Sequence, residues 1–148
     1  MTSVHFASDR MTWATPDSFF AALDAVHRFD LDAAADADNA KCPEFFSKDG
    51  NCGLASSWAG RRVFCNPPYG REIGHWIDKA IAEAAQAQLI VMLVPARTDT
   101  AWWHRAIRTA RVQFLRGRLR FKGAPSCAPF PSALLYWNAF EVTLGGIK

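Results

Sequence analysis

Residues 89–96, with the sequence LIVMLVPA, decide the fold class because they are nearly all apolar. A strand with one solvated face alternates apolar and polar residues, whereas a continuous apolar run is typical of a strand buried on both faces. Such strands occur in parallel sheets that helices cover on both sides. The run therefore predicts a parallel sheet inside an α/β domain.

The segments around this run supply the other elements. Residues 71–87 place Ile73, Trp76 and Ile77 on one face at helical spacing, which predicts an amphipathic helix. Further helices are expected at 16–27 and 99–110, and further strands at 62–65, 112–121 and 132–138, while 29–35 fits a short strand that runs into a turn of small residues. This alternation predicts a compact, doubly wound, largely parallel sheet with flanking helices.

Thr15 and Pro16 mark the start of the helix expected at 16–27. Threonine can cap a helix with its hydroxyl group, and proline suits the first helical turn. Phe19, Phe20 and Leu23 follow at helical spacing. The pattern predicts that the Thr15 side chain caps this helix.

The 148-residue length favours one domain over residues 1–148, with 1–12 loosely ordered and no separate target-recognition domain. No apolar run approaches the ~20 residues that span a bilayer, and the first residues lack the apolar stretch of a signal peptide. A cytoplasmic location with no membrane partner is therefore expected. The four cysteines form no CxxC pair and no histidine pair has ligand spacing, so no metal is expected.

Charge is distributed unevenly along the chain. Residues 1–60 carry four Lys or Arg and nine Asp or Glu, a net charge of −5, and residues 61–148 carry thirteen and five, a net charge of +8. A basic half beside an acidic half suggests an oriented approach to a polyanion.

Residues 66–69, with the sequence NPPY, follow the short strand expected at 62–65. Ligands of such sheets bind at the carboxyl ends of the strands, where this loop lies. The prolines restrict the backbone, so that the Asn66 side-chain oxygen and the Pro67 carbonyl can converge as two acceptors beside the Tyr69 ring. Two acceptors and a flat face suit a planar group that carries an NH₂, such as the amine edge of adenine.

This geometry also suits a reaction at that amine. The lone pair of the adenine amine is delocalised into the ring, and two acceptors that hold its hydrogens favour a tetrahedral nitrogen with a localised lone pair. They also stabilise the positive charge that grows as the nitrogen attacks a methyl group. The remaining contribution is positioning, and no strong general base is needed.

NPPY after a short apolar strand resembles a motif of the S-adenosylmethionine-dependent methyltransferases that modify exocyclic amines. WATPDSFFAAL (13–23), FDLDAAADADNAKC (29–42), LVPARTDTAWWH (93–104) and RGRLRF…PFPSALLYW (116–137) complete a pattern similar to the phage-type DNA adenine methyltransferases. The resemblance covers about residues 13–137. It implies a Rossmann-like methyltransferase fold, S-adenosylmethionine as cofactor, double-stranded DNA as the expected partner and a bacterial host cell as the location.

The resemblance implies a catalytic set of residues: Asn66, Pro67, Pro68 and Tyr69. Asn66 and Pro67 would hold the target amine. Tyr69 would stack on the target base, which a duplex would have to flip out.

The resemblance also implies a cofactor set: Trp13, Thr15, Pro16, Asp32, Ala33, Ala34 and Asn39. Thr15 and Pro16 would lie by the methionine part of the cofactor, and Asp32 would face its amino group. Asn39, Asp36 or Asp38 would reach the ribose hydroxyls. For Trp13, as for Trp102 and Trp103, core packing is the preferred alternative. The turn after Asp32 has alanines where many methyltransferases have glycines, which take positive φ more freely.

Four cations alternate with uncharged residues in the basic half: Arg116, Arg118, Arg120 and Lys122. A strand would place all four on one face. That face is either a charged guard on an edge strand or a ridge that contacts DNA phosphates. Arg97, directly after the 89–96 strand, is a further candidate for DNA binding.

These features predict transfer of a methyl group from S-adenosylmethionine to the exocyclic amine of adenine in DNA, with site-specific or relaxed specificity. Two alternatives stay open: an RNA or protein-glutamine methyltransferase, and a catalytically silent nucleic-acid-binding module with the same fold. The recognition sequence and the oligomeric state are not set by these patterns.

Overall fold

The computed structural model describes residues 13–47, 50 and 52–144. The segment 1–12, expected to be loosely ordered, lies outside the described residues. The described elements are, in chain order, α2 (Asp17–His27), β1 (Leu31–Asp32), β2 (Arg62–Cys65), α3 (Ile73–Glu83), β3 (Leu89–Pro95), α4 (Ala101–Ala106), β4 (Arg111–Phe114) and β5 (Ser132–Trp137).

The strands form one sheet in the order β1-β2-β3-β5-β4. β2 pairs parallel with β1 and with β3, whereas β5 pairs antiparallel with both β3 and β4. Four strands therefore run in one direction, and β5 runs against them between β3 and β4. The expected α/β class is confirmed, but the sheet is mixed rather than largely parallel, because the chain returns from β4 to β5 through a loop and not through a helical crossover.

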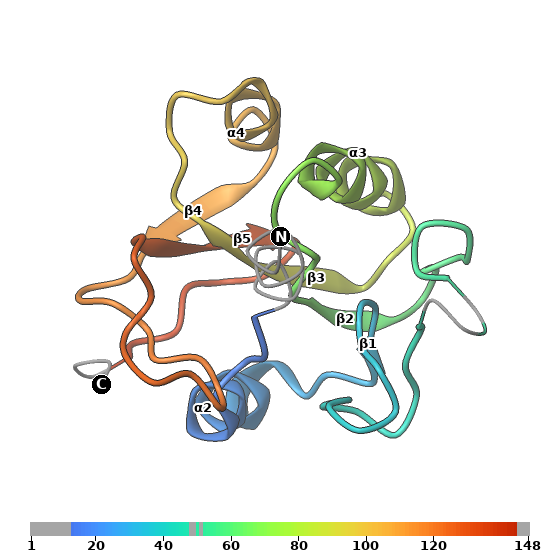
Figure 1. Cartoon of the computed structure of the whole chain (residues 1–148). Coiled ribbons are helices and arrows are strands. Elements are labelled where there is room, and N and C mark those ends of the chain that lie inside the picture. The colour runs from blue at the N-terminus through green and yellow to red at the C-terminus, as the bar shows by residue number, and fades with distance from the viewer. Residues whose placement is uncertain (1–12, 48–49, 51, 145–148) are drawn as a thin grey trace, which may run out of the picture.

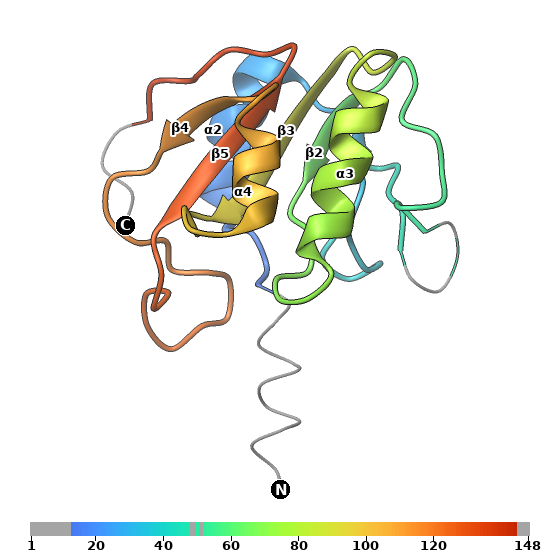
Figure 2. The ribbon, with the colours of Figure 1, turned by 90° about the horizontal axis from the view of Figure 1, so that it is seen from above.

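The sheet lies between two layers of helices. α3 and α4 cover one face and α2 covers the other (Figures 1 and 2). Every residue of β3 and of β5 is buried, as the apolar run at 89–96 predicts for central strands. Among the described residues, no helix is long and apolar enough to cross a membrane.

The start of α2 differs from the sequence expectation. Pro16 occupies the position before the first helical residue and no side chain caps the helix. The Thr15 hydroxyl instead accepts a hydrogen bond from the side chain of Asn66, at 3.0 Å. The predicted Thr15 cap is therefore wrong, because a tertiary partner uses the hydroxyl group.

The strand expected at 112–121 is also wrong over most of its length. β4 ends at Phe114, and Gly117 takes a φ of 77°, which a strand does not allow. Leu119 and Phe121 are buried in the core although they lie in the loop that connects β4 to β5. The four alternating cations therefore do not share one face of a strand.

β1 and the turn after it match the short strand and small-residue turn that the sequence predicts at 29–35. β1 has two residues, and its outer side pairs with Phe45 through an isolated parallel bridge at Asp32. The Asp32 amide donates to the Glu44 carbonyl at 3.0 Å, and the Phe46 amide donates to the Asp32 carbonyl at 3.0 Å. This bridge brings the turn after β1 back to the edge of the sheet.

Candidate active site

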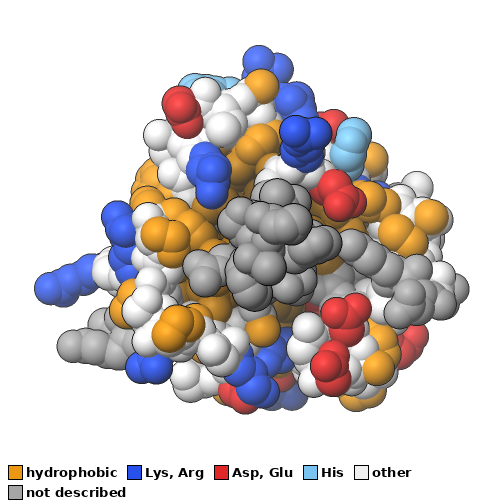
Figure 3. Space-filling view, in the orientation of Figure 1, with side chains coloured by type: hydrophobic (Ala, Val, Ile, Leu, Met, Phe, Trp, Pro, Cys, Tyr) orange, Lys and Arg blue, Asp and Glu red, His pale blue; other side chains and the backbone are white. Residues whose placement is uncertain are grey.

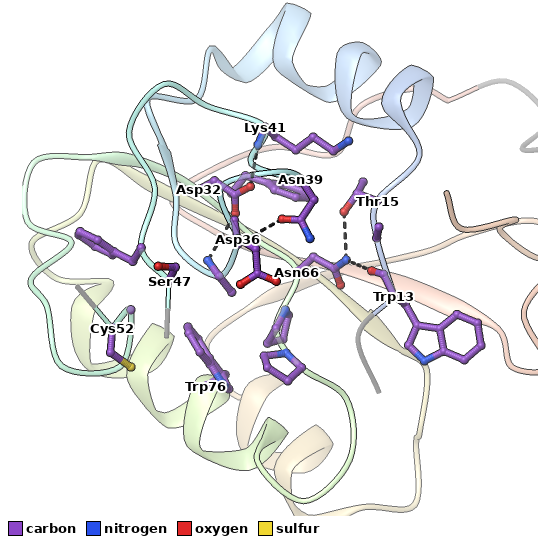
Figure 4. Close-up of a pocket in the computed structure, with 18 residues that line it drawn as sticks. Trp13, Thr15, Asp32, Asp36, Asn39, Lys41, Ser47, Cys52, Asn66 and Trp76 are labelled. Carbon is purple, nitrogen blue, oxygen red and sulfur yellow. Dashed lines mark hydrogen bonds between the residues drawn. The ribbon is translucent and has the colours of Figure 1, made fainter. Parts of the chain in front are cut away.

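A pocket opens at the carboxyl ends of β1 and β2. Asp32 ends β1, and Asn66 directly follows β2, whose residue Phe64 pairs with Asp32. Figure 4 shows the side chains around the pocket. The pocket is lined by Trp13, Ala14, Thr15, Asp32, Ala34, Ala35, Asp36, Asn39, Lys41, Phe46, Ser47, Cys52, Gly53, Phe64, Asn66, Pro67, Pro68 and Trp76. Most of the predicted catalytic and cofactor residues therefore meet at one place.

The Asn66 side chain is held by its nitrogen. Nδ2 donates to the Trp13 carbonyl and, at 3.0 Å, to the Thr15 hydroxyl (Figure 4). A flipped amide would set Oδ1 against the Trp13 carbonyl, so these partners define which end is the oxygen. Oδ1 is buried and has no hydrogen-bond partner among the residues that the structure describes. A buried acceptor without a donor is costly, and here it lies in a residue that lines the pocket.

Pro67 and Pro68 both line the pocket beside Asn66. Pro67 is buried and Pro68 is half-buried. Gly70 follows this loop with a φ of 109°, which L side chains rarely adopt, so the chain can turn sharply into α3. The loop has the rigid build that the sequence predicts, and convergence of the Pro67 carbonyl with the Asn66 oxygen stays a prediction.

Tyr69 lies under the loop rather than beside the pocket. Its side chain is 4% exposed, and its hydroxyl donates to the Leu93 carbonyl at 3.2 Å. Its ring packs edge-on against Phe121 and Phe130, at centroid distances of 6.3 and 5.8 Å. Burial raises the pKa of the Tyr69 hydroxyl well above its usual range. The ring is not presented to solvent in this structure, so a stacking role for Tyr69 stays a prediction that requires Phe121 or Phe130 to move.

Asp32 closes the turn that follows β1. Its Oδ2 accepts from the Lys41 amide at 2.9 Å, and its Oδ1 accepts from the Ala34 amide at 3.4 Å. Burial raises the pKa of this carboxyl group to about 6, although the two backbone amides and the Lys41 charge oppose the shift. A buried carboxylate at a pocket wall suits a cationic partner, because a neighbouring positive charge would restore its ordinary ionisation.

The alanine-rich turn needs no glycine. Among the described residues other than glycine, only Arg28 and Asn138 have positive φ, so the turn after Asp32 is built without left-handed backbone. Ala34 lines the pocket, whereas Ala33 is fully buried behind it. Alanine in place of glycine therefore carries no conformational penalty here.

Asn39 and Asp36 form the far end of the same turn. The Asn39 Oδ1 accepts from the Asp36 amide at 2.8 Å, and the Asn39 amide donates to the Asp36 carbonyl at 3.1 Å. Both residues line the pocket, and Asp38 does not. The Asn39 oxygen is already used by the backbone, which leaves the Asp36 carboxylate as the freer acceptor for a ribose hydroxyl.

Several residues that line the pocket were not expected from the sequence: Lys41, Phe46, Ser47, Cys52, Gly53, Phe64 and Trp76. Trp76 was assigned only to the buried face of its helix, and its indole nitrogen is buried without a partner. Gly53 lies between β1 and β2, outside the described helices and strands, and no periodic sequence pattern there signals a role. The sequence shows the helical spacing of Trp76, but not the contact of its ring with the distant segment around Gly53.

The predicted DNA-binding cations Arg97, Arg116, Arg118, Arg120 and Lys122 are all exposed. Three of them have partners: the Arg97 guanidinium lies 5.9 Å from the Phe130 ring centroid, Arg120 donates to the Ala124 carbonyl at 3.1 Å, and Lys122 pairs with Asp17 at 3.0 Å. Phe130 and Lys122 belong to the loop between β4 and β5. The cations therefore lie on the loop between β4 and β5 and, for Arg97, two residues after the end of β3, rather than on a strand.

Within residues 13–47, 50 and 52–144, no group of three or more His, Cys, Asp or Glu side chains could hold a metal ion. The remaining two predicted residues lie at the edge of the site. Trp13 is half-buried and packs against Phe121 and Phe130, at centroid distances of 5.4 and 5.3 Å, so it has a core role and also lines the pocket. Pro16 is half-buried and does not line the pocket.

The sequence is similar to those of known phage enzymes. It is 38% identical over 103 residues to a DNA N-6-adenine-methyltransferase of Escherichia phage T1, an overlap that covers 68% of this chain and 42% of the relative. It is 31% identical over 107 residues to a DNA N-6-adenine-methyltransferase of Haemophilus phage HP1, which covers 70% of this chain and 61% of the relative. The chain thus spans less than two thirds of the length of either relative.

A sequence profile of one family extends over most of the chain. The profile of DNA N-6-adenine-methyltransferases (Dam) matches residues 2–134. The match includes the whole turn after β1, the NPPY loop and the basic loop between β4 and β5. The chain belongs to the DNA N-6-adenine-methyltransferase (Dam) family.

Proposed function

We propose that this protein transfers a methyl group from S-adenosylmethionine to the exocyclic amine of adenine in DNA. The observation that carries the proposal is the buried, unpartnered Oδ1 of Asn66 at the pocket. A buried acceptor without a donor is unfavourable unless a ligand supplies the donor. An amine hydrogen of adenine is such a donor, and both phage relatives are named for methylation at this amine.

The chemistry follows from the two acceptors. Asn66 Oδ1 and the Pro67 carbonyl would each accept one hydrogen of the amine and draw the nitrogen towards a tetrahedral geometry. Both dipoles would then stabilise the positive charge that develops on the nitrogen as it takes up the methyl group. The proton is lost from the amine after transfer, when its acidity is much higher, so water can accept it.

The proposed cofactor of the pocket is S-adenosylmethionine, which supplies an electrophilic methyl group on a sulfonium sulfur. Asp32 would hold the amino group of the cofactor, because its buried carboxyl group gains from a cationic partner. Asp36 would accept from the ribose hydroxyls. Gly53 would leave room against the wall of the pocket, since a side chain there would meet the backbone of Ala33.

The charge distribution supports DNA as the partner. On the face shown in Figure 3, Lys and Arg side chains occur along the top, the left edge and the bottom, whereas Asp and Glu side chains are most frequent at the lower right. The lower right of Figure 1 contains β1 and the turn that follows it. We propose that the phosphates of duplex DNA lie along the basic loop between β4 and β5, and that the base enters beside Asn66.

We also propose that residues 1–148 form one domain with the Rossmann-like fold of S-adenosylmethionine-dependent methyltransferases. The order of the strands and the reversed β5 between β3 and β4 support this assignment.

The test is incubation of the purified protein with labelled S-adenosylmethionine and, in separate arms, duplex DNA, single-stranded DNA, RNA and a glutamine peptide. Nucleoside analysis should find N6-methyladenine in DNA. The substitution Asn66→Ala should lower transfer about 100-fold or more with the fold retained. Methylation of RNA or of the peptide, but not of DNA, would show that DNA is not the substrate. Binding of the cofactor without methyl transfer to any of the four substrates would favour the catalytically silent nucleic-acid-binding module.

The matched control is Asn138→Gly. Asn138 donates to the Ala84 carbonyl at 2.7 Å, beyond the end of β5 and away from the pocket. Its φ of 60° is one that glycine adopts freely, so the substitution removes an amide without straining the backbone. Transfer should be unchanged in this variant, and near-normal transfer by Asn66→Ala would refute the mechanism.

A further inference from the structure

We propose that Thr15 is a positioning residue for methyl transfer, which holds the Asn66 amide with its oxygen turned towards the substrate amine. This inference rests on the proposed function. It gives Thr15 a role in orienting a catalytic side chain, in place of the contact with the methionine part of the cofactor that the family resemblance implies.

Both hydrogens of the Asn66 amide are taken by the same short segment. The Trp13 carbonyl accepts one, and the Thr15 hydroxyl accepts the other at 3.0 Å. Thr15 is 4% exposed, so water does not compete for this bond. The Trp13 carbonyl selects one of the two amide orientations, because the opposite one would bring Oδ1 against a carbonyl oxygen. The Thr15 hydroxyl accepts the second hydrogen and so restricts rotation of the amide.

The segment that carries these acceptors, residues 13–17, is itself held by contacts with Lys122 and Lys41; we name it the 13–17 strap. The Lys122 amide donates to the Ala14 carbonyl at 2.9 Å. Asp17 pairs with Lys122 at 3.0 Å and also with Lys41, which belongs to the turn that Asp32 closes after β1. Side-chain bonds of Asp17 to these two lysines, Lys41 first, lower its pKa.

The strap therefore links three parts of the proposed site. Lys122 belongs to the basic loop, Lys41 to the turn that Asp32 closes, and Asn66 to the catalytic loop. Loss of the Thr15 acceptor would leave the cofactor turn in place and would free one hydrogen of the Asn66 amide. The amide could then rotate, and the oxygen would spend less time in the productive position.

The test compares Thr15→Val with Thr15→Ser in the full chain. Valine has nearly the same shape and lacks the hydroxyl group, whereas serine keeps it. We expect kcat to fall about tenfold or more in Thr15→Val, while the calorimetric Kd for S-adenosylmethionine changes less than about threefold. Thr15→Ser should return kcat to within about threefold of the natural protein.

Thr109→Val is the control for removal of a threonine hydroxyl that accepts from a side-chain nitrogen. Thr109 accepts from the Trp137 indole at 2.9 Å, at the opposite edge of the sheet. The kcat of Thr109→Val should equal that of the natural protein. In the Asn66→Ala background, Thr15→Val should cause no further loss, because its effect acts through Asn66.

The outcomes separate this inference from the proposed function. An unchanged kcat in Thr15→Val, or a loss of cofactor affinity as large as the loss of kcat, would overturn the positioning role of Thr15. Neither result would contradict the proposed function, because the natural protein would still methylate DNA. If the natural protein methylates nothing, the proposed function fails, and NMR of the Asn66 side-chain amide still decides the geometry. Slow hydrogen exchange that speeds up in Thr15→Val supports the inference, and equal exchange in both proteins overturns it.

Discussion

A Cβ atom placed on Gly53 would lie 2.0 Å from the carbonyl oxygen of Ala33 and 2.9 Å from the Trp76 ring. The segment around Gly53 therefore packs directly on the backbone that follows β1. Gly53→Ala should force these groups apart, lower the free energy of unfolding by about 1–3 kcal/mol or more, and weaken cofactor binding about tenfold. Urea denaturation and calorimetry with S-adenosylmethionine measure the two effects.

Gly50→Ala is the control for this change. Within the described part of the chain, no atom lies within 4 Å of a Cβ atom built on Gly50, and the φ of Gly50 is not in the left-handed region. The two variants add the same methyl group three residues apart. Equal stability and equal cofactor affinity in both would show that Gly53 does not support the pocket.

The Asp32 carboxyl group predicts a pH dependence of cofactor binding. Burial raises the pKa of Asp32 to about 6, and an ammonium partner would lower it again. Affinity for S-adenosylmethionine should therefore weaken as the pH falls below about 6, and binding near that pH should release a proton. Calorimetry in two buffers of different ionisation enthalpy measures the release, and Asp32→Asn should abolish it.

The same shift predicts the opposite pH trend for the stability of the cofactor-free protein. A carboxyl group whose pKa is higher in the folded state binds more protons when folded, between its ordinary value of 3.8 and about 6. Its unfavourable contribution is complete above pH 6 and is relieved as the pH falls towards 4. Urea denaturation at several pH values should show a steeper loss of stability from pH 4 to 6 in the natural protein than in Asp32→Asn.

Arg116 and Arg118 predict a salt effect on DNA binding. Both are exposed on the loop between β4 and β5, where they can reach phosphates. Reversal of both to Glu should weaken binding and reduce the slope of log K against log salt by about two. The control reverses Arg108 and Arg111, which are exposed between α4 and the start of β4, at the opposite edge of the sheet. Equal slopes in the two double variants would exclude the phosphate role.

Removal of the Tyr69 hydroxyl group distinguishes an effect on stability from an effect on catalysis, because the substitution Tyr69→Phe keeps the ring. Its hydroxyl donates to the Leu93 carbonyl in the core, and its ring carries the proposed stacking role. Tyr69→Phe should therefore lower the free energy of unfolding by about 0.5–1.5 kcal/mol and leave kcat within about threefold. Thermal unfolding and steady-state kinetics check this prediction, and a large loss of kcat would assign chemistry to the hydroxyl group.

The sequence was sufficient to predict those elements whose structure depends on the residues of one continuous segment. The apolar run at 89–96 gives β3 and its central place, and the spacing of Ile73, Trp76 and Ile77 gives α3. The short apolar strand followed by two prolines gives β2 and the loop after it. The resemblance in turn names Asn66 and Asp32, which do meet at the pocket.

The sequence was not sufficient where a distant partner decides. Thr15 has the chemistry of a helix cap, but Asn66, 51 residues away in the chain, takes its hydroxyl group. Residues 112–121 alternate like a strand, yet Leu119 and Phe121 are drawn into the core and Gly117 turns the chain out of the sheet. The reversed β5 depends on which edge of β3 is open, and no local pattern records that.

The place of β5 has a consequence for synthesis of the chain. β3 is apolar throughout, and one of its edges pairs with β5, which comes last among the described strands. Until the ribosome has released residues 132–137, this edge of β3 lacks its partner and β4 has nothing to pair with. An open, apolar edge of this kind invites association with other chains. A nascent chain stalled before β5 should therefore depend on chaperones far more than the finished protein does.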